Sequence, residues 1–293
     1  MHLKTLKNIK LKIITYIPII FFAFLYETNE LTAQEYRIPA TNSKDGKLIL
    51  KDFTGDLRVE GYDGREIVFF KTSFEANDGT YDSKQDGELN PPKGISYNSG
   101  ISLQTEKNGN QITVKCLLPG LHTSEYKVRM PGNYSLKIVS NCERSGNITV
   151  SEMRNEVEIS NCQSVKLINN IGSIVLSTVS GNIDLENCRL DKEATLSLVS
   201  ISGNIKADLS RVDTEEPISI NSISGNVNLA LPAKISAAFN LNSLSGMVKS
   251  EFDFPGESKN QFIGTKINFK TNGGGVGINI STVSGNINLR KVN

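Results

Sequence analysis

The sequence predicts an all-β protein, a parallel β-helix or β-solenoid whose short strands form rungs of about 22 residues. A Ser-Gly motif recurs along the second half of the chain, and the residues around its glycine repeat as well. Apolar residues stand at fixed distances from that glycine. No 3.6-residue periodicity persists after the N-terminal segment, which argues against helices. Fixed intervals of this length indicate stacked units and not antiparallel hairpins.

The full motif can be aligned on five glycines from Gly181 to Gly285, and the intervals between them are 22, 22, 21 and 39 residues, the last close to two steps. A weaker match at the first position has the motif only after the glycine. We interpret these glycines as structural, because glycine permits backbone angles that a corner between strands requires. The aligned positions are Gly146, Gly181, Gly203, Gly225, Gly246 and Gly285.

Apolar columns lie seven and five residues before each of the last five glycines and two residues after them, as an alternating strand with one buried face requires. A further apolar column lies two residues before the glycine, at Val179, Ile201, Ile223, Leu244 and Val283. Because this column breaks the alternation by one residue, we expect a corner that turns its side chains into the core as well. Replacing Ile205 or Ile223 by Asp is therefore predicted to abolish folding.

We interpret residues 1–33 as a signal peptide. Lysines within residues 4–12 precede an apolar stretch over residues 13–26, and Ala33 offers a small residue for cleavage. The apolar stretch is shorter than the ~20 residues that span a bilayer as a helix. We therefore expect an exported protein of the periplasm, the cell surface or the medium. It would contact a membrane only through this segment, if the segment stays uncleaved.

We expect one domain over residues 34–293. Its first part, residues 34–140, contains short β-branched and aromatic runs separated by Asp-Gly and Asn-Gly turn signals. We interpret this part as less regular rungs of the same solenoid. A polar stretch over residues 76–94 predicts a surface loop inserted between strands. Residues 141–293 contain the regular repeats.

The chain has four cysteines, all after the predicted signal peptide, and an even number in an exported protein permits two disulfides. Cys142, Cys162 and Cys188 each follow an asparagine, which predicts equivalent places on successive rungs and hence a stacked column. Neighbouring strands lie ~4.8 Å apart, within the range that a disulfide spans. Small buried thiols in a column explain the pattern equally well. A metal site is not predicted, because the CxxC spacing is absent.

No combination of residues in the sequence predicts catalysis, a cofactor or a metal ion. His122 is the one histidine after the N-terminal segment, and it lies in a predicted loop. The glycine run at residues 273–275 lacks the Lys-Ser/Thr of a phosphate-binding loop, so it predicts a flexible turn. The formal net charge is +1 and there is no basic run, so no nucleic-acid partner is expected.

Two groups of polar residues remain. Asp184, Asp208 and Asp213 do not share a repeat position, so an acidic groove of the kind that a polysaccharide lyase uses is the weaker interpretation. The residue after the repeat glycine predicts a structural ladder of stacked amides at Asn182, Asn204, Asn226 and Asn286.

The recurring Val-Ser-Gly-Asn-Ile unit resembles the bacterial family of adhesin-like domains of unknown function, as does the glycine run before the last repeat. That family usually has Asp where this chain has asparagine after the glycine. The resemblance covers roughly residues 36–293 apart from the loop at residues 76–94. The chain is more distantly similar to the head domains of autotransporter adhesins. The resemblance implies a β-helix on an exported or envelope protein, and it transfers no catalytic residue because the shared motif is architectural.

We interpret the chain as an exported, non-enzymatic structural or binding module at the cell envelope. Long flat faces and few protruding loops suit an extended extracellular polymer or an envelope protein as the partner. The second hypothesis is a carbohydrate-active β-helix enzyme, with loops at residues 76–94 and 252–264 framing a cleft. The third hypothesis is a periplasmic partner in envelope signalling.

Overall fold

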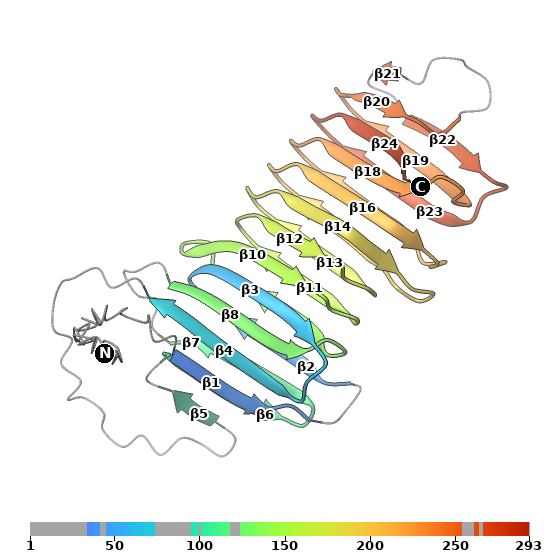
Figure 1. Cartoon of the computed structure of the whole chain (residues 1–293). Coiled ribbons are helices and arrows are strands. Elements are labelled where there is room, and N and C mark those ends of the chain that lie inside the picture. Colours follow the sequence, from blue (N-terminus) through green and yellow to red (C-terminus); the bar gives the residue numbers. More distant parts are fainter. Residues whose placement is uncertain are drawn as a thin grey trace, which may run out of the picture. The chain divides into compact units, whose positions relative to one another are not determined.

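The structure, a computed structural model, describes residues 34–41, 45–73, 95–98, 101–117, 124–253, 261–263 and 266–292. All of them belong to one compact unit, Ala33–Asn293. They form 24 strands and no helix (Figure 1), so the all-β prediction is confirmed for this part of the chain. No helix capable of crossing a membrane is present among these residues. The predicted signal peptide, the loop at residues 76–94 and His122 lie outside them.

The strands form two sheets of twelve strands each. In the order of pairing, sheet A consists of β1 (Gln34–Pro39), β4 (Glu66–Ser73), β8 (Ser124–Pro131), β3 (Gly55–Tyr62), β10 (Ser145–Ser151), β12 (Val165–Ile168), β14 (Ile183–Leu190), β16 (Ile205–Val212), β18 (Val227–Pro232), β24 (Ile287–Val292), β20 (Met247–Ser250) and β21 (Gln261–Ile263). Sheet B consists of β22 (Lys266–Thr271), β19 (Ala237–Ser243), β23 (Val276–Thr282), β17 (Ile218–Ser222), β15 (Leu196–Ser200), β13 (Ile174–Thr178), β11 (Val157–Asn161), β9 (Ser135–Val139), β2 (Lys47–Lys51), β7 (Gln111–Cys116), β6 (Leu103–Asn108) and β5 (Ile95–Asn98).

Most neighbouring strands are parallel, because each rung adds one strand to each sheet. In sheet B, Ile174 pairs with Leu196 and Leu196 pairs with Ile218, so two successive steps are 22 residues long. The steps before them are 21 residues, from Leu136 to Val157, and 17 residues, from Val157 to Ile174. The strands therefore form a β-solenoid-like stack whose rungs vary in length.

The rungs do not stack in sequence order at the C-terminal end. Strand β23 lies between β17 and β19, so Ile278 pairs with both Ile218 and Phe239. Strand β24 lies between β18 and β20 in the same way. The final repeat is thus inserted between the rungs of Gly225 and Gly246, although these two glycines are only 21 residues apart in the sequence. Inserted strands occur near the other end too, where β2 lies between β9 and β7 and β3 lies between β10 and β8.

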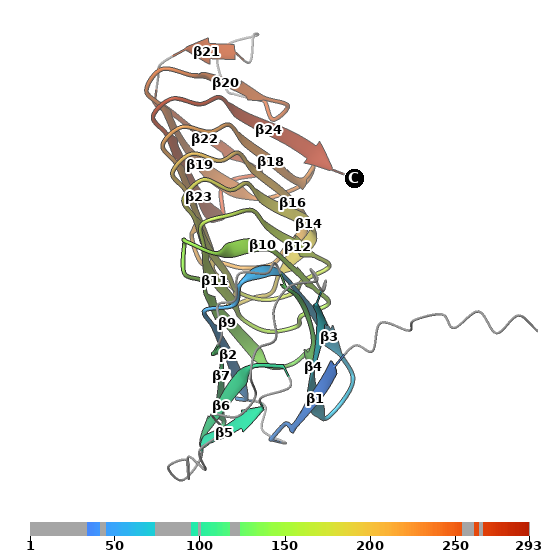
Figure 2. The same ribbon diagram turned by 90° about the vertical axis from the view of Figure 1, so that its left-hand side faces the viewer.

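The two sheets face each other (Figure 2), and their alternating apolar residues fill the space between them. In sheet B, Leu176, Leu198 and Ile220 are at most 1 % exposed. In sheet A, Ile183 and Ile205 are 0 % exposed. The apolar columns predicted five residues before and two residues after the repeat glycine therefore lie in the core.

Antiparallel strands close both ends of the stack. Strands β4 and β1 extend sheet A at one end, and β6 and β5 extend sheet B there. At the other end β21 and β22 pair antiparallel with β20 and β19. Phe269 of β22 stacks on Phe239 of β19, with ring centroids 4.5 Å apart. The terminal strands thereby cover the edges on which another parallel rung could otherwise add.

Candidate binding surface

The corner between the sheets is built around a buried hydroxyl group. Strands of sheet B end on a buried serine or threonine three residues before the repeat glycine, at Thr178, Ser200, Ser222, Thr282 and Ser243. Thr178 donates a hydrogen bond to the carbonyl of Gly181 at 2.8 Å, and Ser200 accepts one from the N–H of Gly203 at 2.9 Å. The inward face therefore keeps its two-residue alternation to the end of the strand.

The residue after this hydroxyl points outward, so the prediction that the last apolar column enters the core is wrong. These side chains are exposed: Val179 44 %, Ile201 45 %, Ile223 52 %, Val283 46 % and Leu244 72 %. In the order of the stacked rungs they follow one another along one corner, and we call them the apolar ridge. Of the two substitutions predicted to abolish folding, only the one at Ile205 concerns the core.

Backbone hydrogen bonds hold the ridge residues in register. The N–H of Ser202 donates to the carbonyl of Val179 at 2.9 Å, and the N–H of Ser224 donates to that of Ile201 at 2.9 Å. The same contact repeats on the next two rungs at 2.9 and 3.1 Å. The corner is therefore stacked as regularly as the sheets, and successive ridge side chains lie about one strand spacing, ~4.8 Å, apart.

The repeat glycines permit close packing between rungs. Their φ angles are not positive, whereas that of Gly55 is 75°. The prediction that the repeat glycines adopt a backbone angle that other residues avoid is therefore wrong. A Cβ atom on Gly203 would lie 2.0 Å from the carbonyl oxygen of Gly181, and one on Gly225 would lie 2.1 Å from that of Gly203. The glycines of neighbouring rungs thus leave no space for a side chain.

The asparagines after these glycines form a ladder from side chain to backbone. Oδ1 of Asn182 accepts a hydrogen bond from the N–H of Asn204 at 2.9 Å, and Oδ1 of Asn204 accepts one from the N–H of Asn226 at 3.0 Å. An aspartate can fill the same place, since Asp56 accepts from the N–H of Asn147 at 2.9 Å. The ladder needs an acceptor oxygen, which explains why either residue type suits the position.

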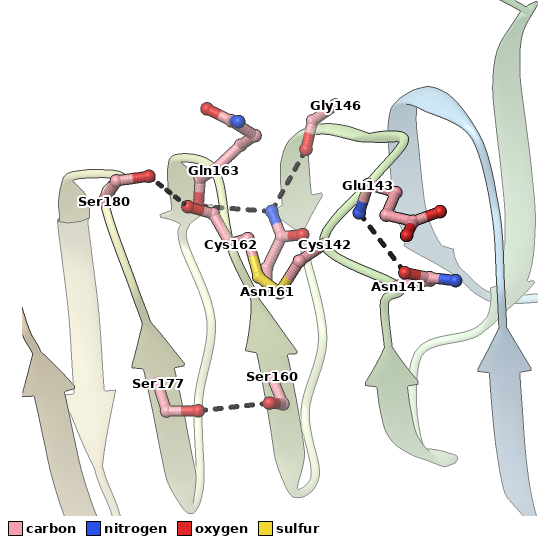
Figure 3. Close-up of a disulfide and its surroundings, with 10 residues drawn as sticks. All are labelled: Asn141, Cys142, Glu143, Gly146, Ser160, Asn161, Cys162, Gln163, Ser177 and Ser180. Atoms are coloured by element: carbon pink, nitrogen blue, oxygen red, sulfur yellow. Dashed lines mark hydrogen bonds between the residues drawn. A yellow bond between two sulfur atoms is a disulfide. The ribbon is translucent and has the colours of Figure 1, made fainter.

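A disulfide joins Cys142 and Cys162 at the end of the apolar ridge (Figure 3), and their Cα atoms are 5.2 Å apart. Cys162 takes the place of a ridge residue on its rung, because the N–H of Ser180 donates to its carbonyl at 3.1 Å. Cys188 lies instead on β14 in sheet A, where its thiol is free and buried. The predicted column of three cysteines is therefore wrong, because Cys188 does not occupy an equivalent place.

The outer face of sheet B beside the ridge carries no charged side chain over five neighbouring strands, β13, β15, β17, β23 and β19. Their outward-facing residues, which we call the uncharged face, are Ser, Asn, Val, Ala and Gly only. The side-chain amide of Asn240 on β19 donates to Oδ1 of Asn279 on the neighbouring strand β23 at 3.3 Å. Val199, which is 39 % exposed, continues the apolar surface from the ridge onto this face.

Charged residues mark both borders of the uncharged face. On one side, Lys137 of β9 and Glu158 of β11 form an ion pair at 2.6 Å. On the other side, Lys266 and Lys270 are exposed on β22. The absence of charge is therefore confined to the five strands that precede the apolar ridge residues.

The outer face of sheet A has the opposite character. Lys166 and Glu186 form an ion pair at 2.8 Å, and the ammonium group lowers the pKa of the Glu186 carboxyl. Lys206 lies 3.4 Å from Asp184, one of the residues considered for an acidic groove. Asp213, another of them, pairs with Arg211 at 2.5 Å. These two carboxylates thus belong to surface ion pairs.

The buried titratable groups belong to the core. Burial raises the pKa of the Cys188 thiol to about 11, which suppresses the reactive thiolate. Tyr126 donates to the carbonyl of Ile101 at 3.2 Å, and burial raises its pKa above the usual range. Within the described ranges, no group of three or more His, Cys, Asp or Glu could hold a metal ion.

The glycine run at residues 273–275 lies in the turn between β22 and β23. Gly273 and Gly274 have φ angles of 82° and 90°, which favour glycine. A strand follows this turn, whereas a phosphate-binding loop would lead into a helix. The sequence-based interpretation as a turn is therefore confirmed.

Two surface hollows, of about 400 and 390 Å³, are lined by residues that do not belong to the uncharged face. Asp52, Lys115 and Arg144 line the first, which adjoins the disulfide. Asp52 and Lys115 form an ion pair at 3.4 Å. Arg211 and Lys234 line the second hollow, which is more open. Neither hollow contains a residue of the apolar ridge.

Sequence reasoning missed the apolar ridge as a surface, although a signal was present. Ile201 stands between Ser200 and Ser202, and the alternation of Leu196 and Leu198 continues without a break if Ser200 faces inward. A hydroxyl group can be buried at a strand end when it bonds to nearby backbone. The exposed position of Ile201 follows from that single assignment.

The family described as Toastrack DUF4097 matches residues 37–290. A "putative cell adhesion protein" from Clostridium sporogenes ATCC 15579 is 13 % identical, with 89 % of this chain and 100 % of that chain covered and a TM-score of 0.36. A "putative lipid binding protein" from Parabacteroides distasonis ATCC 8503 is 14 % identical, with 88 % and 97 % covered and a TM-score of 0.35. No curated protein matches the chain.

Proposed function

The chain belongs to the Toastrack DUF4097 family, and on that premise we propose that it is an exported, non-enzymatic binding module of the bacterial cell envelope. Its scaffold is a parallel β-helix, and its ligand surface consists of the apolar ridge and the uncharged face. The alternatives remain a carbohydrate-active enzyme and a periplasmic partner in envelope signalling.

The observation that carries this proposal is the apolar ridge. Five aliphatic side chains, each at least 44 % exposed, follow one another on successive rungs. Single exposed aliphatic residues are common on protein surfaces, but an unbroken line beside a charge-free face is typical of interaction sites. The buried hydroxyl groups inside the corner fix this arrangement, because they hold each ridge residue on the outer side.

Two observations support export. The N-terminal segment has the basic and apolar parts of a signal peptide, with Ala33 at the cleavage position. The Cys142–Cys162 disulfide suits an oxidising compartment, since disulfides seldom persist in the reducing cytosol. Together they favour a folded domain outside the cytoplasmic membrane.

Fractionation of cells that express the full chain tests the export part. We expect the protein outside the cytoplasm, starting at Gln34 by mass, with two of its four cysteines oxidised. A cytoplasmic protein that keeps residues 1–33 and four free thiols would overturn this part of the proposal.

Binding to isolated envelope material tests the surface. Ile223→Lys places a charge at the middle of the ridge, and Asn228→Lys places the same charge on the sheet A face of the same rung. We expect the first variant to lose about tenfold in affinity and the second to bind as the parent does. An equal loss of affinity in both variants, or no loss in either, would exclude the ridge as the binding surface. Release of reducing sugar ends that Asp184→Asn abolishes would favour the enzyme alternative.

A further inference from the structure

We infer that the uncharged face and the apolar ridge bind an extended, uncharged polysaccharide laid across successive rungs. This inference rests on the proposed function and adds the class of ligand. It follows from three properties of the surface, namely its charge, its extent and the kind of side chains that it repeats.

The charge pattern selects against charged ligands. The five strands of the uncharged face present no ionisable side chain, whereas Lys137 and Glu158 border them on one side and Lys266 and Lys270 on the other. A polyanion or a polycation would lie on this face without counter-charges and would lose hydration there. An uncharged polymer needs no counter-charge and loses no ionic hydration on this face. The lack of charge on the surface therefore suits a ligand without charge.

The extent of the surface favours a narrow, extended ligand over a second folded copy. Five strands at ~4.8 Å spacing, with outward columns that span about four residues at ~3.3 Å each, cover roughly 24 Å by 13 Å, or about 310 Å². A stable protein–protein interface buries about 800 Å² on each partner and relies on Trp, Tyr and Arg anchors. The uncharged face and the ridge contain none of these three residue types.

The side chains of this surface match the chemistry of a sugar chain. Rows of serine and asparagine can donate to and accept from sugar hydroxyl groups. The amide of Asn221 already donates to Oγ of Ser219 on the same strand at 3.1 Å. Ile201 and Ile223 offer aliphatic contact to the C–H faces of the rings. Because the same groups recur on each rung, a polymer of repeated units can engage several rungs at once, which raises its avidity without strong single contacts.

Affinity electrophoresis of the full chain through gels that contain soluble polysaccharides tests this inference. The neutral probes are hydroxyethylcellulose, dextran and mannan; the charged probes are carboxymethylcellulose and chitosan. Hydroxyethylcellulose and carboxymethylcellulose share one backbone, so their comparison isolates the effect of charge. We expect retardation by at least one neutral polymer and at least tenfold weaker retardation by carboxymethylcellulose. Ile223→Lys should weaken the neutral interaction about tenfold, and Asn228→Lys should leave it unchanged.

The other outcomes separate the ligand class from the proposed function. If only charged polymers retard the protein and Ile223→Lys abolishes this, the surface is right and the ligand class is wrong. If no neutral polymer binds and the protein sediments as a dimer that Ile223→Lys dissociates, the surface is a self-association face and the inference fails. If neutral polymers bind but only Asn228→Lys weakens them, both the inference and the assigned surface fail.

Discussion

The side-chain oxygen of Asn286 accepts a hydrogen bond from the backbone N–H of Met247 at 2.8 Å, although Met247 comes 39 residues earlier in the chain. The N–H of Asn286 in turn donates to Oδ1 of Asn226 at 2.9 Å. The last repeat is thus placed between two earlier ones. Met247 ends the ladder, and the position needs no acceptor oxygen there because no parallel rung follows.

Substitution by Asp on the two sides of the corner should have opposite effects. Ile205 is 0 % exposed, so Ile205→Asp buries a charge in the core and should prevent folding. Ile223 is 52 % exposed, so Ile223→Asp should fold with a change in stability below about 1 kcal/mol. Circular dichroism and thermal melting of both variants give the answer. Loss of folding in both variants would contradict the exposed position of Ile223 and indicate that its side chain lies in the core.

Alanine at a repeat glycine should be costly for a steric reason. In Gly203→Ala the new Cβ would lie 2.0 Å from the carbonyl oxygen of Gly181, so the rungs would have to separate. We expect a loss of about 3 kcal/mol or more in the free energy of unfolding. Gly277→Ala is the matched control, because a Cβ there has no neighbour within 4 Å. Denaturant unfolding that finds the two variants equally stable would contradict the close-packing role.

The ladder predicts that aspartate is tolerated after the glycine and that an apolar residue is not. Asn204→Asp keeps the oxygen that accepts the N–H of Asn226, so its stability should stay close to that of the parent. Asn204→Leu removes this acceptor and should cost about 1 kcal/mol, a modest value because the position is exposed. Chemical denaturation at neutral pH measures both. A leucine variant as stable as the parent would show that the ladder contributes nothing.

The buried Cys188 thiol should make the fold sensitive to alkaline pH. Its pKa is raised by burial from an ordinary 9.0 to about 11, so the unfolded chain releases this proton first. Ionisation of this thiol has no effect on stability below about pH 9, and stability falls as the pH rises toward 11, by about 2 to 3 kcal/mol in total. Cys188→Ala should make the stability profile less steep between pH 9 and 11. An unchanged profile would mean that this thiol is not the titrating group.

Much of the fold could be predicted from the sequence because the core of a stacked β-sheet is periodic. The columns that contain Leu198 and Ile205 recur at fixed distances from the glycine, and periodicity alone places them inside. The order of the rungs could not be predicted this way, since similar repeats can pair with one another in any order. One clue was available: only the repeat at Gly246 has Met247 in place of asparagine.

The candidate surface was harder to predict because two corner arrangements fit the same pattern. Hydrophobicity favoured burial of Ile223 and exposure of Ser222, whereas the structure buries Ser222 at 5 % exposure and leaves Ile223 in solvent. The hydrogen bonds between corner hydroxyl groups and the glycine backbone decide between them, as Ser243 illustrates by donating to the carbonyl of Gly285 at 2.9 Å. A hydrophobic pattern does not reveal such local hydrogen bonds.

Hydroxyl-radical footprinting, with and without saturating envelope material, tests the central claim most directly, because it reports which side chains a ligand covers. We expect bound ligand to protect Ile201, Ile223 and Leu244 on the apolar ridge and to leave Lys206 and Arg290 on the sheet A face as reactive as before. Protection of the sheet A residues, with a ridge that stays reactive, would contradict the assignment of the binding surface.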